Sequence, residues 1–284
     1  MTRPHIEFIR SQALPWREGL YAGYRPKIES KTLSEDSVTG EASLLIRYPS
    51  GWQQDGPGHL TVDEELFVLG GSLTMNGRTY SEFAYAHLPA GYQRAQMSAP
   101  GGAVALTFFS GVPAFVAGSA PAGSLDERRL VEYADGLYQP YDNNFERMGS
   151  ADVNVDGIGL KLLREDPISR EQTWLLGAVA NWPGGVVEIH PVVEEMYLVS
   201  GEIVGNCGSM KSGAYFWRPP GVRHGPFATC QPCVHFFRSK GGPLSTVFEA
   251  PKTPFHWDYP YNPILPPELA EFGKSEWHGP ATRY

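Results

Sequence analysis

The residues best suited to chemistry are Glu188, His190 and Glu194, in the segment EIHPVVEEMYLVSG that begins at Glu188. Glu188 and His190 are two residues apart, so on a β-strand their side chains point to the same face. A carboxylate and an imidazole buried together in an apolar interior are costly unless a partner satisfies them. A metal ion is one such partner, and the segment therefore directs attention to further ligands elsewhere in the chain.

The elements that position these residues occur twice. LSEDSVTGEASLL begins at Leu33 and LREDPISREQTWLL at Leu163, an offset of 163 − 33 = 130. The same offset aligns EELFVLGG with EEMYLVSG, and AYAHLPAG with AYFWRPPG. One ungapped offset over roughly sixty residues is the signature of an internal repeat. The chain therefore contains two copies of one module.

Both copies have the pattern of an all-β protein. Short apolar or alternating runs such as SLLIRYP, FAYAHLP and CVHFFR are separated by Gly, Pro and Asn, which is typical of a sandwich or barrel. We expect a first barrel over residues 1–112 and a second over 158–250. Residues 113–157 would be a linker with one short helix, capped by Ser124 with Glu127 three residues on. The tail, 251–284, is rich in Pro and aromatic residues and is expected to pack on a barrel.

The second copy carries two spaced motifs. Four residues have the spacing of the second signature of the cupin superfamily: Gly213, Pro219, Gly221 and His224. Three have the spacing of its first signature: His190, Glu194 and Gly201. Glu188 stands where the family has its first His, and Ala228 stands where it has a closing Asn. With these two departures, the chain resembles a cupin.

The resemblance implies a fold and a metal site. Each copy would form a double-stranded β-helix barrel, which makes the chain a bicupin, and the second barrel would hold one divalent metal. His190, Glu194 and His224 would be ligands, and Glu188 would either be a fourth ligand or turn outward to a basic neighbour. Imidazole and carboxylate ligands with open positions suit Fe(II), Mn(II) or Zn(II). We expect Fe(II), with Mn(II) and Zn(II) as alternatives.

Other candidate site residues lie on the strands of the second copy. His235 could serve as an acid or base in the pocket, or be a hydrogen-bonded core histidine. Three aromatic residues could contact a substrate or belong to the plain core: Trp182, Tyr215 and Trp217. Cys230 and Cys233 have the spacing of a redox or zinc pair. However, the strand-like VHFF follows them and a second CxxC is missing, so two ordinary thiols are the preferred interpretation.

The first copy lacks the ligand set. Subtracting 130 from the four ligand positions gives Gly58, Leu60, Glu64 and Arg94. A metal site of the same kind is therefore not expected there. A buried carboxylate needs another cation, and Arg94 could supply it. We predict a Glu64–Arg94 ion pair in the vacant metal position, the alternative being an Arg94 that points to solvent.

Composition narrows the function further. The net charge of −8 argues against nucleic acid as a partner. No run of about 18 apolar residues indicates a membrane span, and MTRPHIEFIR lacks the apolar core of a signal peptide, so we expect a cytoplasmic protein. The expected partner is a small molecule, and a homodimer remains open.

Because one fold hosts many functions, three classes are considered. The first is a metal-dependent oxidoreductase, a non-haem dioxygenase acting on a small oxygenated or aromatic substrate. The second is a non-redox metal-dependent hydrolase, decarboxylase or isomerase. The third is a cupin that binds a small molecule without catalysis.

Overall fold

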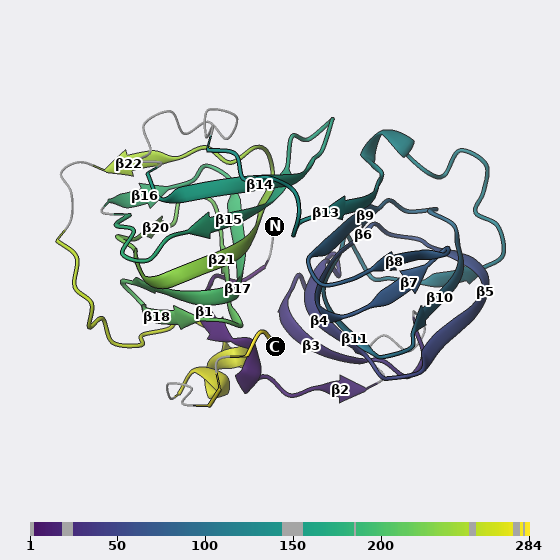
Figure 1. The fold of residues 1–284 in the computed structure, drawn as a ribbon, viewed down its shortest axis with the longest axis horizontal. Helices are drawn as coiled ribbons and strands as arrows, with labels where there is room; N and C mark the ends of the chain where they lie inside the picture. Colours follow the sequence, from purple (N-terminus) through teal and green to yellow (C-terminus); the bar gives the residue numbers. More distant parts are fainter. Residues whose placement is uncertain are drawn as a thin grey trace. The chain divides into compact units, whose positions relative to one another are not determined.

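The computed structural model describes residues 3–18, 25–143, 156–184, 186–249, 254–274, 279–280 and 282–284. The chain divides into two compact units, one built mainly from Leu14–Tyr138 and the other from Pro4–Ala13 with Gln139–Tyr284 (Figure 1). Each unit consists of antiparallel sheets, as the short apolar runs predicted. No helix in the described part of the chain is long and apolar enough to cross a membrane.

The first unit has two sheets that curve around one apolar core. The seven-stranded sheet has the spatial order β13 (Val131–Asp135), β9 (Ala84–Leu88), β6 (Glu64–Gly71), β11 (Ala103–Phe109), β4 (Ala42–Tyr48), β3 (Glu29–Glu35) and β2 (Arg17–Glu18). The five-stranded sheet has the order β12 (Phe115–Ala117), β5 (Trp52–Leu60), β10 (Arg94–Ala99), β7 (Leu73–Met75) and β8 (Arg78–Tyr80).

The second unit repeats this plan. Its large sheet has the order β1 (Ile6–Arg10), β19 (Ala214–Arg218), β17 (Val193–Gly205), β21 (Ala228–Lys240), β15 (Gln172–Ala178) and β14 (Ile158–Glu165), with β18 (Gly208–Lys211) paired to β17. Its small sheet has the order β20 (Arg223–His224), β16 (Val187–Ile189) and β22 (Val247–Glu249). The small sheet matters most here, because it carries two of the candidate ligands.

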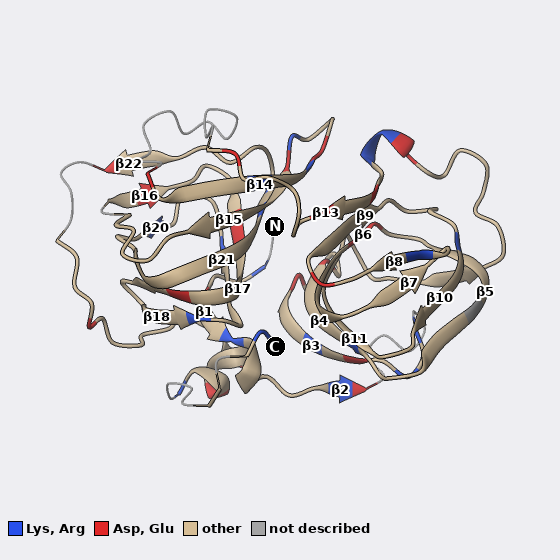
Figure 2. Ribbon diagram, viewed as in Figure 1, with Lys and Arg blue, Asp and Glu red and all other residues tan. Residues whose placement is uncertain are grey.

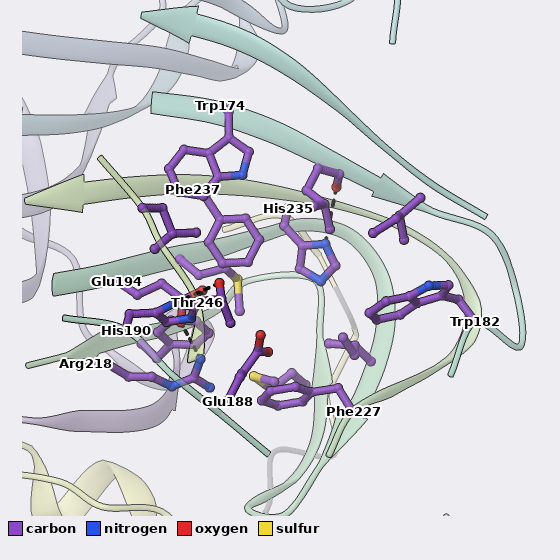
Figure 3. A pocket seen from close by; sticks show the side chains of 17 residues that line it. Trp174, Trp182, Glu188, His190, Glu194, Arg218, Phe227, His235, Phe237 and Thr246 are labelled. Carbon is purple, nitrogen blue, oxygen red and sulfur yellow. Dashed lines mark hydrogen bonds and ion pairs between the residues drawn. The ribbon is translucent and has the colours of Figure 1, made fainter. Parts of the chain in front are cut away.

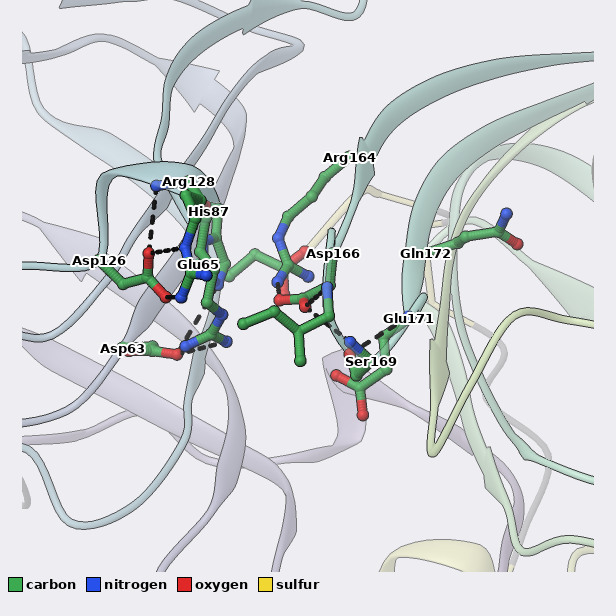
Figure 4. A network of polar contacts seen from close by, with 12 residues as sticks. Asp63, Glu65, His87, Asp126, Arg128, Arg164, Asp166, Ser169, Glu171 and Gln172 are labelled. Carbon is green, nitrogen blue, oxygen red and sulfur yellow. Dashed lines mark hydrogen bonds and ion pairs between the residues drawn. The ribbon is translucent and has the colours of Figure 1, made fainter.

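The predicted repeat holds in the strand register. Ser34 pairs with Ser43, and Arg164 pairs with Thr173, which is the same pairing shifted by 130. Both hairpins have a bulge directly before this pair. Asp166 closes its hairpin turn by accepting hydrogen bonds from the backbone N–H groups two and three residues on (Figure 4), and Asp36 does the same in the first unit. Residues that are 130 positions apart in the sequence therefore occupy equivalent positions in the two units.

The sequence predicts that the first residues of the chain belong to the first barrel, whereas the structure places Pro4–Ala13 in the second unit. Strand β1 pairs with β19, and Ile6 and Phe8 are fully buried there. The edge of β19 supplies backbone partners that the alternating pattern of β1 alone could not specify. The C-terminal tail packs in the same unit, where Tyr261 lies against Phe8 with ring centroids 5.1 Å apart.

The helix predicted near Ser124 is wrong. Asp126, not Ser124, caps a single 3-10 turn, η2 (Glu127–Arg129), and the chain then continues as strand β13. β13 pairs with the open edge of β9, and this tertiary pairing overrides the local capping pattern. Residues 113–143 are thus partly built into the first unit, while residues 144–155 of the predicted linker lie outside the described residues.

The first barrel is closed around a buried ion pair. The predicted Glu64–Arg94 pair is confirmed, with Nη2 of Arg94 at 2.8 Å from Oε2 of Glu64. A second guanidinium joins it, since Nη2 of Arg25 lies 3.0 Å from the same oxygen. The three side chains are 0–2% exposed. Two arginines therefore stand beside the carboxylate whose counterpart in the second copy is a candidate metal ligand.

This arrangement predicts that Glu64→Leu will lower the free energy of unfolding by about 3–5 kcal/mol, because two buried guanidiniums lose their shared carboxylate. The triple variant Glu64→Leu/Arg25→Met/Arg94→Met should recover most of the loss. Urea unfolding measures both. Glu29→Gln is the control, because its pair with Arg47 is partly exposed and worth at most about 1 kcal/mol. A triple variant no more stable than the single one would contradict the assignment.

Candidate metal centre

Two short strands and the start of a long one bring the candidate ligands together. Glu188 on β16 lies directly opposite His224 on β20. His190 follows the end of β16, and Glu194 lies at the start of β17. Gly221 has a φ of 82°, a conformation that favours glycine, in the turn before β20. The residue spacing within the two motifs therefore reflects the pairing of β16 with β20 and the turn that precedes β20.

The four side chains converge. Glu188, His190 and His224 can each place one ligand atom within 4.8 Å of the others. Oxygens of Glu194 lie 3.6 Å from Nε2 of His190 and 3.4 Å from Nε2 of His224. Glu188 does not turn away to a basic neighbour; its Oε1 lies 3.8 Å from Nε2 of His224. The side chain of Glu188 is 27% exposed, which makes it the most accessible of the four.

Hydrogen bonds orient both imidazoles for metal binding. Nδ1 of His190 lies 2.9 Å from the carbonyl oxygen of Ser245, and Nδ1 of His224 lies 3.0 Å from that of Val222. A carbonyl can only accept, so each Nδ1 carries the proton and each Nε2 keeps its lone pair. Both Nε2 atoms are buried without a hydrogen-bond partner. Buried acceptors without partners are costly, and a divalent cation among these four residues would satisfy them.

The charges of the centre also favour a cation. Burial raises the pKa of Glu188 to about 7, so this carboxyl binds a proton readily unless a cation takes its place. Burial acts to raise the pKa of Glu194 too, but the electrostatic influence of the His190 ring and the Arg218 guanidinium outweighs it and lowers that pKa. Burial lowers the pKa of His224 to about 4, which keeps this ring neutral and able to ligate at pH 7.

The centre also contains an arginine, Arg218, which the two motifs do not predict. Nη1 of Arg218 donates to Oε2 of Glu194 at 2.7 Å, and its other nitrogens hold the carboxylate of Glu7 on β1. Burial acts to raise the pKa of Glu7, but Arg218 lowers it to about 2, so the pair is ionised. Glu7 and Arg218 are 211 residues apart in sequence. Glu194 and Arg218 are paired across neighbouring strands, and this pairing could have indicated that Arg218 belongs to the centre. It can be recognised only once the register of the two strands is known.

A cavity of about 130 Å³ opens beside the centre (Figure 3). Its polar lining residues are Glu188, His190, Glu194, Arg218, His235 and Thr246. Its remaining lining residues are apolar or aromatic: Ile158, Trp174, Leu176, Trp182, Met196, Ile203, Met210, Phe216, Phe227, Phe237 and Leu244. The polar groups of the candidate centre therefore meet a mostly apolar chamber.

Of the three aromatic residues proposed for the pocket, Trp182 lines the cavity, whereas Tyr215 and Trp217 do not. Side chains alternate along a strand, and Phe216 takes the inward position on β19. Tyr215 is buried on the other face, where its hydroxyl donates to Glu195. Trp217 is also buried, and its backbone pairs with Ile6 of β1.

His235 enters the cavity from β21 (Figure 3). Its Nδ1 lies 3.3 Å from the carbonyl oxygen of Leu176, and burial lowers its pKa to about 4, so the ring is neutral at pH 7. The CxxC cysteines are free thiols on this strand, with Cys230 exposed and Cys233 buried. The preference for two ordinary thiols is in keeping with this placement.

A family model described as "Domain of unknown function (DUF4437)" matches residues 16–246. The chain belongs to the DUF4437 family. The region matched by the family model includes both copies of the repeat, so the model covers two barrels and not one. No curated protein sequence matches the chain.

Solved structures resemble this DUF4437 protein in fold. A candidate dioxygenase from Nostoc punctiforme PCC 73102 matches with a TM-score of 0.77, 17% identity and coverage of 88% of this chain and 92% of that one. Salicylate 1,2-dioxygenase from Pseudaminobacter salicylatoxidans matches with a TM-score of 0.51, 12% identity and coverage of 73% and 74%. Oxalate decarboxylase from Bacillus subtilis matches with a TM-score of 0.51, 14% identity and coverage of 85% and 78%. These likenesses show the fold, and the predicted bicupin is confirmed.

For this DUF4437 protein, His224→Ala is expected to abolish stoichiometric metal binding, because it removes one of two imidazoles. Glu188→Gln should be milder, weakening binding about 10-fold to 100-fold. Elemental analysis after reconstitution with Fe(II), Mn(II) or Zn(II) measures occupancy. The control is His256→Ala, which changes an exposed histidine of the tail. Unchanged occupancy in His224→Ala would remove this residue from the ligand set.

Glu7→Gln is expected to weaken metal binding about 10-fold, as loss of an outer partner of a ligand typically does. Without the charge of Glu7, Arg218 is balanced by Glu194 alone, and this carboxylate is less available to a metal. Calorimetric titration with Zn(II) gives the affinity, and circular dichroism checks the fold. Glu18→Gln, on exposed strand β2, is the matched control. Equal affinity in both variants would mean that Glu7 plays no part in the centre.

Proposed function

We propose that this chain is a metal-dependent cupin enzyme of the dioxygenase type, acting on a small aromatic substrate held beside the metal. One observation carries the proposal. Two buried Nε2 lone pairs and two carboxylates meet beside one cavity, which Glu188, His190 and Glu194 line and whose other walls are mostly apolar and aromatic. Such a cavity binds an apolar ring and brings it to a centre able to hold a divalent cation.

Glu188, His190, Glu194 and His224 would hold the metal. When bound, a divalent metal with open positions supplies polarisation of a substrate oxygen and, for a redox-active ion, reaction with dioxygen. The two carboxylates balance the charge of a divalent ion. This hard, anionic set favours Fe(II) or Mn(II), and Zn(II) remains an alternative.

The chain's own residues do the positioning. Ser245 and Val222 hold the two imidazoles through their Nδ1–H groups. Arg218 fixes Glu194 by its hydrogen bond to Oε2, which leaves Oε1 directed to His190. Phe227 lies near His224, with ring centroids 6.0 Å apart, and helps to exclude water from the inner side of the centre.

The fold relatives include a salicylate 1,2-dioxygenase and an oxalate decarboxylase, and the cavity is better suited to an aromatic ring than to oxalate. Oxalate is small and doubly charged. Arg218 is the one Lys or Arg among the described lining residues, and it already holds Glu7 and Glu194. In the described part of the chain, other Lys and Arg positions are dispersed over strands, turns and loops (Figure 2). An apolar, aromatic lining suits a ring better than a dicarboxylate.

Dioxygen uptake tests the proposal. Protein loaded anaerobically with Fe(II) is expected to consume dioxygen when single-ring phenols are added, and His224→Ala is expected to consume none. His256→Ala should behave as the wild type. Release of carbon dioxide without dioxygen uptake would instead support a decarboxylase. Metal binding with no turnover of the phenols would contradict the proposed activity.

A further inference from the structure

The volume of the cavity suits an occupant with a single ring. A cavity of about 150 Å³ lined by apolar side chains holds one benzene molecule, and the volume here is about 130 Å³. The walls include flat aromatic surfaces, since Trp174 and Phe237 stack with ring planes 10° apart and centroids 5.3 Å apart. A single six-membered ring fits such a chamber.

The charged residues that line the cavity favour an occupant of a particular net charge. The charge of Arg218 is balanced by Glu7, and Arg218 also donates a hydrogen bond to Glu194. A divalent metal would be neutralised by Glu188 and Glu194. An anionic substituent on the ring would then have no unmatched positive charge among the described lining residues and would lose its hydration. The cavity therefore favours a neutral compound.

His235 offers the ring one hydrogen-bond acceptor. Its Nδ1 faces the carbonyl oxygen of Leu176 and must carry the proton, so Nε2 is the acceptor. The sulfur of Cys233 lies 3.8 Å from Nε2 and 3.9 Å from Nδ1. A sulfur equally far from both nitrogens does not lie along the lone pair of Nε2. This lone pair remains available to a ligand in the cavity, into which the imidazole projects (Figure 3).

We propose that the site selects a neutral, single-ring aromatic compound that carries one oxygen for the metal and a second hydroxyl that donates a hydrogen bond to Nε2 of His235. His235 is thus a specificity-determining residue. The inference rests on the proposed function, because it places a substrate oxygen at the metal. It goes further in naming the class of compound and the residue that distinguishes its members.

The test compares ligands that differ by one hydroxyl. Dissociation constants are measured by calorimetry, without dioxygen, on protein loaded with Zn(II). The ligands are phenol and 1,3- and 1,4-dihydroxybenzene, whose two oxygens cannot chelate one ion. At least one dihydroxybenzene should bind about threefold to tenfold more tightly than phenol, the gain expected from one neutral hydrogen bond. The matching fluorophenol has the same shape but no second donor, and should bind like phenol.

Variants assign the preference to His235. His235→Leu should bind phenol and the dihydroxybenzenes equally, and His235→Gln, which keeps an acceptor, should retain part of the preference. Cys233→Ala removes the neighbouring thiol and should behave as the wild type. A preference that survives in His235→Leu, or its absence from the wild type, would overturn the inference. The fluorophenol comparison needs only the wild-type protein, so it decides the matter even if a variant does not fold.

The outcomes separate this inference from the proposed function. Metal binding and the dihydroxybenzene preference without dioxygen uptake would leave the inference standing and remove the dioxygenase proposal. Dioxygen uptake without tighter binding of a dihydroxybenzene would support the dioxygenase proposal and overturn the inference about His235. Metal binding with no affinity for any ring compound would overturn the substrate class itself.

Discussion

A buried carboxylate at the same position in both barrels is the constraint on which the rest of the structure depends. Glu64 and Glu194 are related by the repeat offset, and each lies inside a barrel where an unpaired negative charge would be prohibitively costly. In the first unit two arginines meet the demand, and the barrel is packed around them. In the second unit Arg218 meets part of it, and two imidazoles with open lone pairs face the same carboxylate.

The groups that face the buried carboxylate differ between the two barrels, and this difference explains why only the second barrel has a candidate metal centre. A guanidinium brings its own charge and fills the space, so the first barrel is complete as a structural unit. Imidazoles bring lone pairs but little charge, because burial keeps His224 neutral. In the proposed function the second barrel takes up a cation from outside, and it carries a cavity beside the candidate ligands. One repeated arrangement thus supports a closed core in one copy and a candidate reaction chamber in the other.

Glu7 connects the start of the chain to this chamber. Strand β1 precedes the first unit in the sequence but pairs with β19 in the large sheet of the second unit. This pairing buries Glu7 against Arg218. The pair is electrically neutral, so Arg218 can hold Glu194 without withdrawing it from a metal. The centre consequently depends on a residue near the start of the chain as well as on the two motifs. It was not visible in the motif region alone, because a salt bridge across 211 positions leaves no local pattern.

The sequence by itself determined the repeat, the all-β class, the bicupin fold and the residues of the two motifs, since each depends on spacing along a strand or a turn. It also predicted the Glu64–Arg94 pair, because the offset carried one copy's chemistry onto the other. Only the tertiary structure decided the partner of Arg218, the second arginine at Glu64 and the inward choice of Phe216 over Tyr215 and Trp217. Alternation says that neighbours on a strand face opposite sides, but which side is interior depends on how distant strands close the barrel.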